Sequence, residues 1–313
     1  MKTISIVVPA YNEEENILPL VKAIHEQFPK DRYHYRILIV DDGSSDGTLT
    51  VLEKIAQDDP HLFYLSLSRN FGHQNALKAG IDHAEGDAVI TMDADLQHPP
   101  HLLKALIEKW EEGYDIVYTR RADNQNASFV KRKTGNAYYR MFNWLAEVNL
   151  DHGAADFRLM DRRVVDIFSQ LEERDLFIRG LVRWMGFSQI GIDYEPAKRL
   201  KGKTKYSLRK MIVFAVSGIT SMSIRPLYAA IYLGLTLSLL AVLSIPFVIY
   251  SFQPRHHIVF IWASLLVTIV FFGGLQLTVL GMIGLYIGKT YTQVKHRPLY
   301  LIQKTNLPID TSR

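Results

Sequence analysis

Formal charge nearly disappears from the last part of the chain, and no other feature limits its fold as strongly. Of the 36 Lys and Arg and 32 Asp and Glu residues, only seven lie beyond Arg225, and residues 226–254 and 256–288 carry no formal charge. Each stretch exceeds the roughly 20 apolar residues with which a helix crosses about 30 Å of hydrocarbon. Uncharged runs of this length are hard to cover inside one globular domain. The sequence therefore predicts a transmembrane helical hairpin with its turn at residues 253–257; two buried helices of a soluble core are the alternative.

Basic residues flank the predicted hairpin on one side. They comprise Arg199, Lys201, Lys203, Lys205, Arg209, Lys210 and Arg225 before the first span, and Lys289, Lys295 and Arg297 after the second. The connecting turn contains only one, Arg255. Because positive charge stays on the cytoplasmic side, we expect an integral membrane protein with two spans, with both termini and the preceding domain in the cytoplasm.

Short β-branched runs alternate with amphipathic stretches in the charged part of the chain. The predicted strands cover residues 4–8, 35–40, 63–67, 88–92 and 116–118, and the predicted helices cover residues 16–28, 48–57, 74–84 and 101–111. This alternation predicts an α/β fold, a mostly parallel sheet with helices on both faces. Such sheets bind ligands at the carboxyl ends of their strands, so the loops there are the candidate site.

Acidic residues follow two of these strands. Asp93 and Asp95, directly after a buried strand, offer oxygen ligands with which Mg²⁺ or Mn²⁺ would bridge a diphosphate, and Gln97 is a candidate third ligand. Helix capping is the alternative for one of the two carboxylates. Asp42 is a candidate acceptor for the N–H of a nucleotide base, and a structural role in a turn is its alternative. Asp46 is expected to cap a helix.

Several classes of function lose their main signatures. No Gly-x-Gly-x-x-Gly follows a strand and no Gly-x-x-x-x-Gly-Lys-Ser/Thr occurs, which disfavours dinucleotide oxidoreductases and P-loop hydrolases. The absence of cysteine removes disulfides, thiolate zinc sites and cysteine nucleophiles. A zinc site built from histidines is also disfavoured, since the dispersed histidines are expected to be solvated: His73, His83, His98, His101 and His152.

Four segments give a specific resemblance: PAYNEEEN, VDDGSSDGT, SRNFGHQNA and MDADLQHPP. In this order and spacing they resemble the GT-A glycosyltransferase domain of the polyprenyl-phosphate glycosyltransferases, the group that includes dolichol-phosphate mannose synthase. The two spans and the segment RLKGKTKY at residues 199–206 resemble its bacterial branch, the bactoprenol glucosyltransferases. The resemblance covers roughly residues 3–290 and implies a GT-A fold followed by the predicted hairpin.

The resemblance also implies roles on the donor side of the site. The residues that would hold the base, ribose and diphosphate, directly or through the metal ion, are Pro9, Tyr11, Glu13, Asp42, Asp93, Ala94, Asp95 and Gln97. Arg120 would contact the sugar or a phosphate. Arg199 and Lys205 are candidate phosphate ligands, although Lys203 and Thr204 replace the Glu-Ser pair common in this loop of the family.

On the acceptor side, Asp156 falls where the family has an Asp, as a base or an orienting group. A phosphate acceptor is already ionised at neutral pH and needs no general base. We therefore favour an orienting or electrostatic role for Asp156 with Arg158 as its partner; a structural Asp–Arg pair is the alternative. Two further stretches, residues 177–187 and 206–224, are candidates for lying in the membrane interface, and for the first of them packing on the sheet is an equal alternative.

These features predict four regions: residues 1–165 as the catalytic core, 166–225 as an acceptor-side strand, basic loop and juxtamembrane helices, 226–290 as the two spans, and 291–313 as a cytoplasmic tail. The expected activity is inverting transfer of a sugar, glucose from UDP-glucose, to an undecaprenyl-type phosphate. A non-catalytic nucleotide-sugar-binding membrane adaptor is the alternative. We expect no nucleic-acid partner, a homo-oligomer supported by Gly284-x-x-x-Gly288, and a flippase or later transferase as further partner.

Overall fold

The charged part of the chain folds around one mixed β-sheet. The structure is a computed structural model, and it describes residues 1–29, 31–121, 151, 153–195, 218–221, 223–251 and 258–308. Within these residues the sheet has eight strands in the order β7-β5-β6-β4-β1-β2-β3-β8. Their bounds are β1 Lys2–Ala10, β2 Tyr33–Asp41, β3 Leu62–Leu67, β4 Ala88–Thr91, β5 Ile116–Arg121, β6 Ala154–Asp161, β7 Gln189–Tyr194 and β8 Ile302–Thr305.

The centre of the sheet is parallel, as the alternation of strands and helices predicts. β1 pairs in parallel with β2 and β4, with Ile6 opposite Ile37 and Ile90, and β2 pairs in parallel with β3. β6 runs antiparallel between β4 and β5, β7 runs parallel to β5, and β8 runs antiparallel to β3. The sheet therefore extends beyond residue 165, the bound predicted for the catalytic core.

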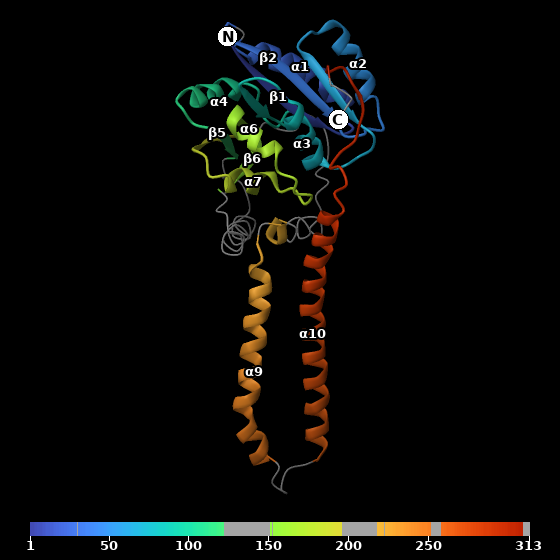
Figure 1. Ribbon diagram of the computed structural model, residues 1–313, viewed down its shortest axis with the longest axis vertical. Coiled ribbons are helices and arrows are strands. Elements are labelled where there is room, and N and C mark those ends of the chain that lie inside the picture. Colours follow the sequence, from blue (N-terminus) through green and yellow to red (C-terminus); the bar gives the residue numbers. More distant parts are fainter. Residues whose placement is uncertain are drawn as a thin grey trace.

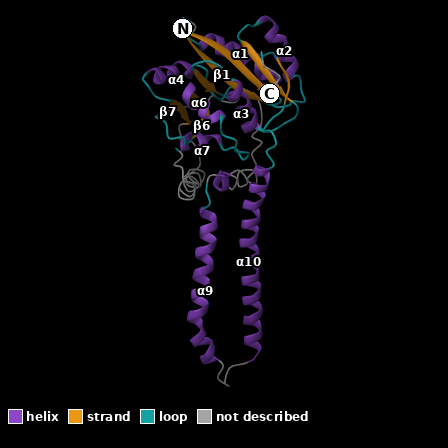
Figure 2. Cartoon of the chain, viewed as in Figure 1, coloured by secondary structure: helices purple, strands orange, loops and turns teal. Residues whose placement is uncertain are grey.

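Helices cover both faces of the sheet (Figure 2). One core joins α1 (Glu14–Gln27), α2 (Thr48–Asp58) and α4 (Leu102–Glu111) to side chains such as Ile4 and Ile6. A second core joins α3 (His73–His83), α6 (Arg162–Ser169) and α7 (Ile178–Trp184) to the opposite face, where Val7 points. Successive residues of β1 thus serve opposite faces, as the pleat of a strand requires.

Helix α7 settles one alternative left open by the sequence. Ile178, Leu181 and Val182 are buried in the second core, whereas Trp184 is exposed. The stretch at residues 177–187 therefore packs on the sheet through its apolar side. Most of the second stretch, residues 206–224, lies outside the described residues.

Two long helices leave the sheet domain side by side (Figure 1). They are α9 (Arg225–Ser251) and α10 (Ile258–Val294), and their segments Arg225–Ser244 and Thr268–Val294 are long and apolar enough to cross a membrane. Neither segment is covered by other parts of the described chain. A soluble core would bury them, so this exposure matches the predicted hairpin and not its alternative. Among the described residues, a Cβ at Gly281, Gly284 or Gly288 would meet nothing within 4 Å. The described part of the hairpin therefore shows no close packing at these glycines, and self-association through them stays a prediction.

Helix α10 is tied back to the sheet domain at its C-terminal end. The Lys289 ammonium pairs with Asp175, and the Gln293 amide accepts from the Arg174 N–H at 3.0 Å and donates to the Glu172 carbonyl at 2.9 Å. The chain then returns to β8. The segment predicted as a tail from residue 291 therefore contributes the end of α10 and an edge strand of the sheet.

Candidate active site

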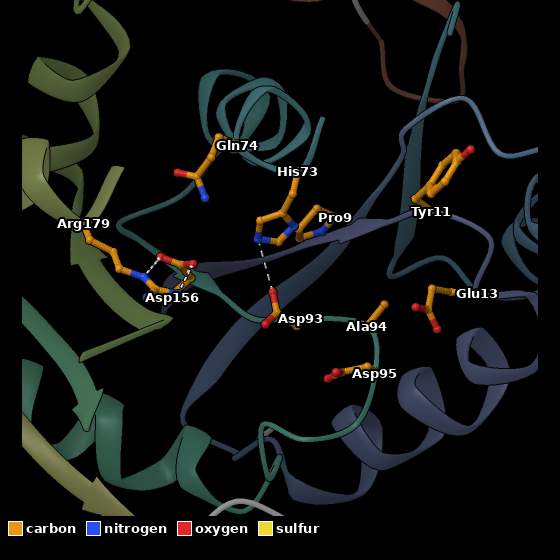
Figure 3. A pocket seen from close by; sticks show the side chains of 10 residues that line it. All are labelled: Pro9, Tyr11, Glu13, His73, Gln74, Asp93, Ala94, Asp95, Asp156 and Arg179. Carbon is orange, nitrogen blue, oxygen red and sulfur yellow. Dashed lines mark hydrogen bonds and ion pairs between the residues drawn. The ribbon is translucent and has the colours of Figure 1, made fainter. Parts of the chain in front are cut away.

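A pocket of about 330 Å³ opens at the carboxyl ends of β1 and β4. Figure 3 shows its lining, which comprises Pro9, Tyr11, Glu13, His73, Gln74, Asp93, Ala94, Asp95, Asp156 and Arg179. Seven of these ten are residues that the sequence singles out for the donor or acceptor side. β1 begins at the end of the domain remote from α9 and α10 (Figure 1), so its carboxyl end and the pocket lie on the side of the hairpin.

The end of β1 is held in place by the loop that follows β2. Asn12 has a left-handed backbone with φ of 55°, its N–H donates to Ser44 Oγ at 2.9 Å, and its side-chain oxygen accepts from the Ser45 N–H at 2.8 Å. The Glu13 N–H donates to Thr48 Oγ1 at 3.0 Å. These bonds fix the turn that presents Tyr11 and Glu13 to the pocket.

The predicted metal carboxylates face the pocket and not the protein interior. Ala94 is buried at 3% exposure, and Asp93 and Asp95 on either side of it line the pocket. Leu96 takes a left-handed backbone with φ of 59°, while the Asp95 carboxylate accepts from the Gln97 N–H at 3.1 Å. A short carboxylate that bonds the backbone two residues on stabilises such a turn.

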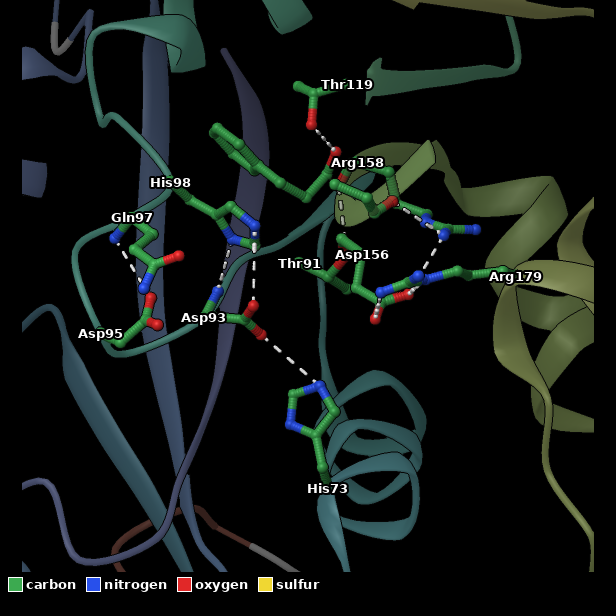
Figure 4. Close-up of polar contacts among 12 residues, drawn as sticks. His73, Thr91, Asp93, Asp95, Gln97, His98, Thr119, Asp156, Arg158 and Arg179 are labelled. Carbon is green, nitrogen blue, oxygen red and sulfur yellow. Dashed lines mark hydrogen bonds and ion pairs between the residues drawn. The ribbon is translucent and has the colours of Figure 1, made fainter. Parts of the chain in front are cut away.

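His98 is buried, which corrects the expectation that it is solvated. Its ring is 6% exposed, stacks on Phe157 at 5.1 Å and meets Tyr194 edge-on at 6.2 Å. Its Nδ1 accepts from the Asp93 N–H at 2.9 Å, which leaves the proton on Nε2, 3.6 Å from Asp93 Oδ2 (Figure 4). His98 therefore anchors the backbone of the first metal carboxylate.

Asp156 lies between two guanidinium groups, and this geometry bears on its predicted role (Figure 4). Arg179 binds both carboxylate oxygens, Nε to Oδ1 at 2.9 Å and Nη2 to Oδ2 at 2.7 Å, and Arg158 Nη2 approaches Oδ1 at 3.3 Å. Burial alone would raise the pKa of Asp156, but the charge and hydrogen bonds of Arg179, with Arg158, hold it well below the ordinary value. This pairing favours the ionised form of Asp156 at neutral pH.

Sequence reasoning missed three residues of the lining. Arg179 was considered only as part of a stretch that lies in the membrane interface or packs on the sheet, and the structure shows its guanidinium facing Asp156. His73 and Gln74 begin α3, and His73 Nε2 lies 3.5 Å from Asp93 Oδ1. A signal for these two existed, because both stand in the segment SRNFGHQNA that contributes to the family resemblance.

Asp42 is close by but does not line the pocket. It is 2% exposed, and its two oxygens accept from the N–H groups of Phe71 at 2.7 Å and Gly72 at 3.0 Å. Burial raises its pKa, and these two bonds oppose the rise. The geometry shows Asp42 in the structural role that was its alternative, since it holds the loop from which α3 starts; its contact with a base stays a prediction. Asp46 stands one residue before Gly47, the N-cap of α2, and its carboxylate accepts from the Thr48 N–H at 3.0 Å at the start of that helix.

Two further predicted site residues, Arg120 and Gln97, lie in the described part of the chain but do not line the pocket. Arg120 forms an ion pair with Asp193 of β7 at 2.8 Å, which ties β5 to β7. Gln97 contributes its backbone N–H to Asp95 and is absent from the lining. Arg199 and Lys205 lie outside the described residues. Contacts of these four with a phosphate or a metal ion stay predictions.

The donor set fits a divalent cation that shares its ligands with a substrate. Within the described ranges no group of three or more His, Asp or Glu side chains is arranged to hold a metal ion. Mg²⁺ is usually bound by one or two carboxylates together with substrate phosphates and water. Asp93 and Asp95 supply such a pair of carboxylates at the wall of an open pocket, and diphosphate oxygens would complete the coordination.

The chain is similar in sequence to a known protein family and to individual relatives. Residues 5–168 match the family described as Glycosyl transferase family 2. A relative named SfII prophage-derived bactoprenol glucosyl transferase, from Shigella flexneri, is 40% identical over 303 residues, which cover 97% of this chain and 98% of the relative. An uncharacterized glycosyltransferase of Synechocystis is 43% identical over 299 residues, 96% of this chain and 94% of the relative.

A solved structure shares the fold of the sheet domain. Mannosyl-3-phosphoglycerate synthase from Rubrobacter xylanophilus superposes with a TM-score of 0.50 at 19% identity, covering 69% of this chain and 71% of that one. At this level of identity the likeness concerns the fold alone. It supports the GT-A type of sheet that the sequence motifs imply.

Proposed function

The chain belongs to glycosyl transferase family 2, and from this premise we propose that it transfers a sugar from a nucleotide-diphosphate sugar to the phosphate of a polyprenyl lipid. The donor in this proposal is UDP-glucose, the acceptor is an undecaprenyl-type phosphate, and the site faces the cytoplasm. One observation carries the proposal: the chain has a pocket with two carboxylates on the side of its sheet that faces an apolar helical hairpin. The hairpin would keep the enzyme where a lipid acceptor resides, while the pocket is open to a water-soluble donor.

The names of the relatives support the choice of acceptor and sugar. The Shigella flexneri relative is named for glucosyl transfer and for bactoprenol, and it matches this chain from the sheet domain through the hairpin. Because the match includes both apolar helices, it covers the whole arrangement on which the proposal depends.

In this proposal the two ends of the pocket bind different parts of the substrates. Tyr11 and Glu13 lie at one end and, with Pro9 nearer the middle, would hold the nucleoside, while Asp93 and Asp95 lie between Glu13 and Asp156 (Figure 3). A Mg²⁺ or Mn²⁺ ion bound there would neutralise the departing diphosphate. The carboxylates of Asp93 and Asp95 would orient that diphosphate so that its sugar projects toward Asp156.

Transfer in this proposal is a single displacement. An oxygen of the acceptor phosphate attacks the anomeric carbon, the bond from that carbon to the diphosphate oxygen breaks, and the configuration inverts because the two oxygens lie on opposite sides. No proton has to be removed from the ionised acceptor. Asp156, held as a carboxylate by Arg179 and Arg158, would fix these guanidinium groups at the acceptor end and would not act as a base.

The topology supports a location on one side of the membrane. α9 leaves the sheet domain and α10 returns to it, where β8 joins β3, so the domain and the end of the chain share one side. The excess of basic residues beside the domain then favours the cytoplasm. We also retain, as a proposal, residues 226–290 as the region of the two spans.

A transfer assay tests the proposed function. Full-length protein in lipid vesicles receives undecaprenyl phosphate and radiolabelled UDP-, GDP- or CDP-sugars, with Mn²⁺, Mg²⁺ or a chelator. We expect a labelled lipid only with a nucleotide sugar and a divalent cation, with UDP-glucose as the most efficient donor and with inverted anomeric configuration. Metal-dependent binding of UDP without any lipid product would instead identify the adaptor alternative.

A further inference from the structure

A second cavity, of about 450 Å³, lies at the junction between the sheet domain and α10. Its lining comes from α3, from the end of α6 and the chain after it, and from the segment that follows α10: Lys78, Asp82, Ser169, Leu171, Glu172, Arg174, His296, Arg297, Pro298, Leu299 and Tyr300. None of these residues lines the candidate active site. Figure 1 shows the segment after α10 running past α3 toward the C-terminus, which brings these three parts of the chain together.

The floor of this cavity is a closed polar network. Lys78 is 2% exposed, and its ammonium donates to Asp82 Oδ1 at 2.5 Å and to the Ser169 carbonyl at 3.1 Å. Tyr300 donates its hydroxyl to the other oxygen of Asp82 at 3.0 Å. The charges of Lys78 and Asp82 therefore balance each other, and the net charge of the cavity is decided at its mouth.

The mouth is predominantly basic. It has the guanidinium groups of Arg174 and Arg297 and the imidazole of His296, against the single carboxylate of Glu172. In the part of the chain that the structure describes, neither guanidinium has an ion pair or a side-chain hydrogen bond. Arg297 is exposed and Arg174 is half-buried. Two guanidinium groups at one cavity are suited to bidentate recognition of phosphate oxygens.

The position of the cavity along the chain also places it at the level of the lipid headgroups of the proposed membrane. Lys289 is the first charged residue after the uncharged run that α10 contains, so the hydrocarbon boundary lies near it. His296 and Arg297 follow within eight residues, about 10 Å further along the chain direction, which corresponds to the headgroup layer. The ties from Gln293 to Arg174 and Glu172 hold the cavity wall at this level.

From these observations we propose that the cavity binds the phosphate headgroup of an anionic phospholipid of the surrounding bilayer, with Arg174 and Arg297 as the phosphate ligands. Basic pockets beside membrane-spanning helices on the cytoplasmic side commonly bind anionic headgroups. The acyl chains would extend along α10, whose side chains at this end are largely exposed. The site would fasten the sheet domain to the membrane independently of the donor and acceptor, so it does not rest on the proposed transfer reaction.

Thermal unfolding of the full-length protein in a neutral detergent tests the proposal. Phosphatidylglycerol is added to the wild type, to Arg174→Gln, to Arg297→Gln and to the double variant, with phosphatidylcholine and inorganic phosphate as separate arms. We expect phosphatidylglycerol to raise the wild-type Tm by about 3 °C or more, and phosphatidylcholine to leave it unchanged. The single variants should lose part of the rise and the double variant should lose it. Inorganic phosphate should give a smaller rise with the same dependence on the two arginines.

A matched control removes the same number of charges elsewhere. Lys22 and Lys54 are exposed on α1 and α2, on the part of the domain away from the hairpin. The variant Lys22→Gln with Lys54→Gln should keep the full rise in Tm with phosphatidylglycerol. If both double variants lose the rise in Tm to the same extent, the effect depends on the overall charge of the protein and not on the cavity. That result would overturn the proposal.

Two other results would also overturn it. One is a wild-type Tm that responds equally to phosphatidylglycerol and phosphatidylcholine. The other is that undecaprenyl phosphate raises the Tm in a way that depends on Arg174 and Arg297, whereas phosphatidylglycerol does not raise it. That result would identify the cavity as a site for the acceptor lipid. Failure of sugar transfer in the assay above would leave these measurements unaffected, so the two proposals fail separately.

Discussion

The carboxylate of Asp156 shows how single residues set the charge of the candidate active site. It is 5% exposed and remains ionised because Arg179 and Arg158 surround it. Removing one partner from such a buried pair leaves an uncompensated charge, which usually costs about 3–5 kcal/mol. The arrangement therefore ties the electrostatics of the pocket to the stability of the domain.

This pairing predicts a specific dependence of stability on pH. The pKa of Asp156 is lowered in the folded protein, so its contribution to stability is present above the unfolded pKa of about 4 and is lost as the pH falls toward the folded pKa. Asp156→Asn removes this contribution. Thermal unfolding should show the wild type more stable than the variant at pH 6, with the difference shrinking from pH 4 downward. A difference that stays constant down to pH 3 would contradict the pairing.

His98 gives a second prediction at this scale. His98→Phe keeps a ring to stack on Phe157 but removes the acceptor for the Asp93 N–H, and a buried donor without a partner costs about 1–3 kcal/mol. We expect Mn²⁺-dependent binding of UDP, measured by calorimetry, to weaken about tenfold, since 1.4 kcal/mol corresponds to that factor.

Two variants separate positioning from packing at His98. His98→Asn retains a side-chain acceptor but loses the ring, so it should bind UDP more tightly than His98→Phe while unfolding at a lower temperature. His101→Phe, at an exposed position of the same segment, should bind like the wild type. Wild-type affinity in His98→Phe would show that the bond to Asp93 does not position the site.

The sequence predicted residues of the site only where a side chain suited to bind a metal ion or substrate directly follows a predicted strand. Asp93 and Asp95 follow a buried strand, so their residue type and place both indicate a metal site. The burial of His98 depends on Phe157 of β6 and Tyr194 of β7, which lie far away in the sequence. Arg179 resembles any interfacial arginine until the fold places Asp156 opposite it.

At the scale of elements, strand β8 connects the membrane helix to the sheet. Asn306, directly after β8, accepts from the Tyr64 N–H at 2.7 Å and donates to the Leu62 carbonyl at 3.1 Å, and thus continues the pairing with β3. Lys304 pairs with Glu53 of α2 at 2.5 Å. Together with the contacts of Lys289 and Gln293, these bonds attach the chain at both ends of the segment between α10 and the sheet.

Asn306→Ala should weaken this attachment. Because two hydrogen bonds at a partly exposed edge are lost, we expect the free energy of unfolding to fall by about 1 kcal/mol, and the amide of Tyr64 to exchange faster with deuterium. Gln303→Ala, at an exposed position within β8, is the matched control and should leave the exchange of Tyr64 unchanged. Unchanged exchange in Asn306→Ala would mean that β8 is not held through this residue.

The elements differ in how well the sequence predicts them. The parallel strands and α1 to α4 were predicted within a few residues of their bounds, because apolar and polar residues alternate there with a clear period. β8 has only four residues, and its charge and polarity resemble a tail. β6 becomes a strand through antiparallel pairing with β4 and β5, a long-range partnership for which periodicity gives no sign.

At the scale of the whole molecule, the sheet domain stands at one end of the two long helices (Figure 1), and the strand that ends at the pocket, β1, begins at the far end of the domain. The sequence predicted this division well, since the loss of charge beyond Arg225 is a property of composition and needs no tertiary information. It did not predict that the chain returns to the sheet after α10. That return fixes the height of the domain relative to the apolar helices, and with it the reach of the pocket toward a lipid.

The central claim is that the carboxylates of Asp93 and Asp95 serve sugar transfer, and one measurement tests it most directly. The initial rate of transfer from labelled UDP-glucose to undecaprenyl phosphate is compared for the wild type, Asp95→Asn and the control Asp58→Asn, an exposed carboxylate of α2. Loss of a ligand to a cation that stabilises the leaving diphosphate should lower the rate of Asp95→Asn by about 10³-fold, with an unchanged Tm, and leave Asp58→Asn active. Transfer by Asp95→Asn at the wild-type rate would contradict the account.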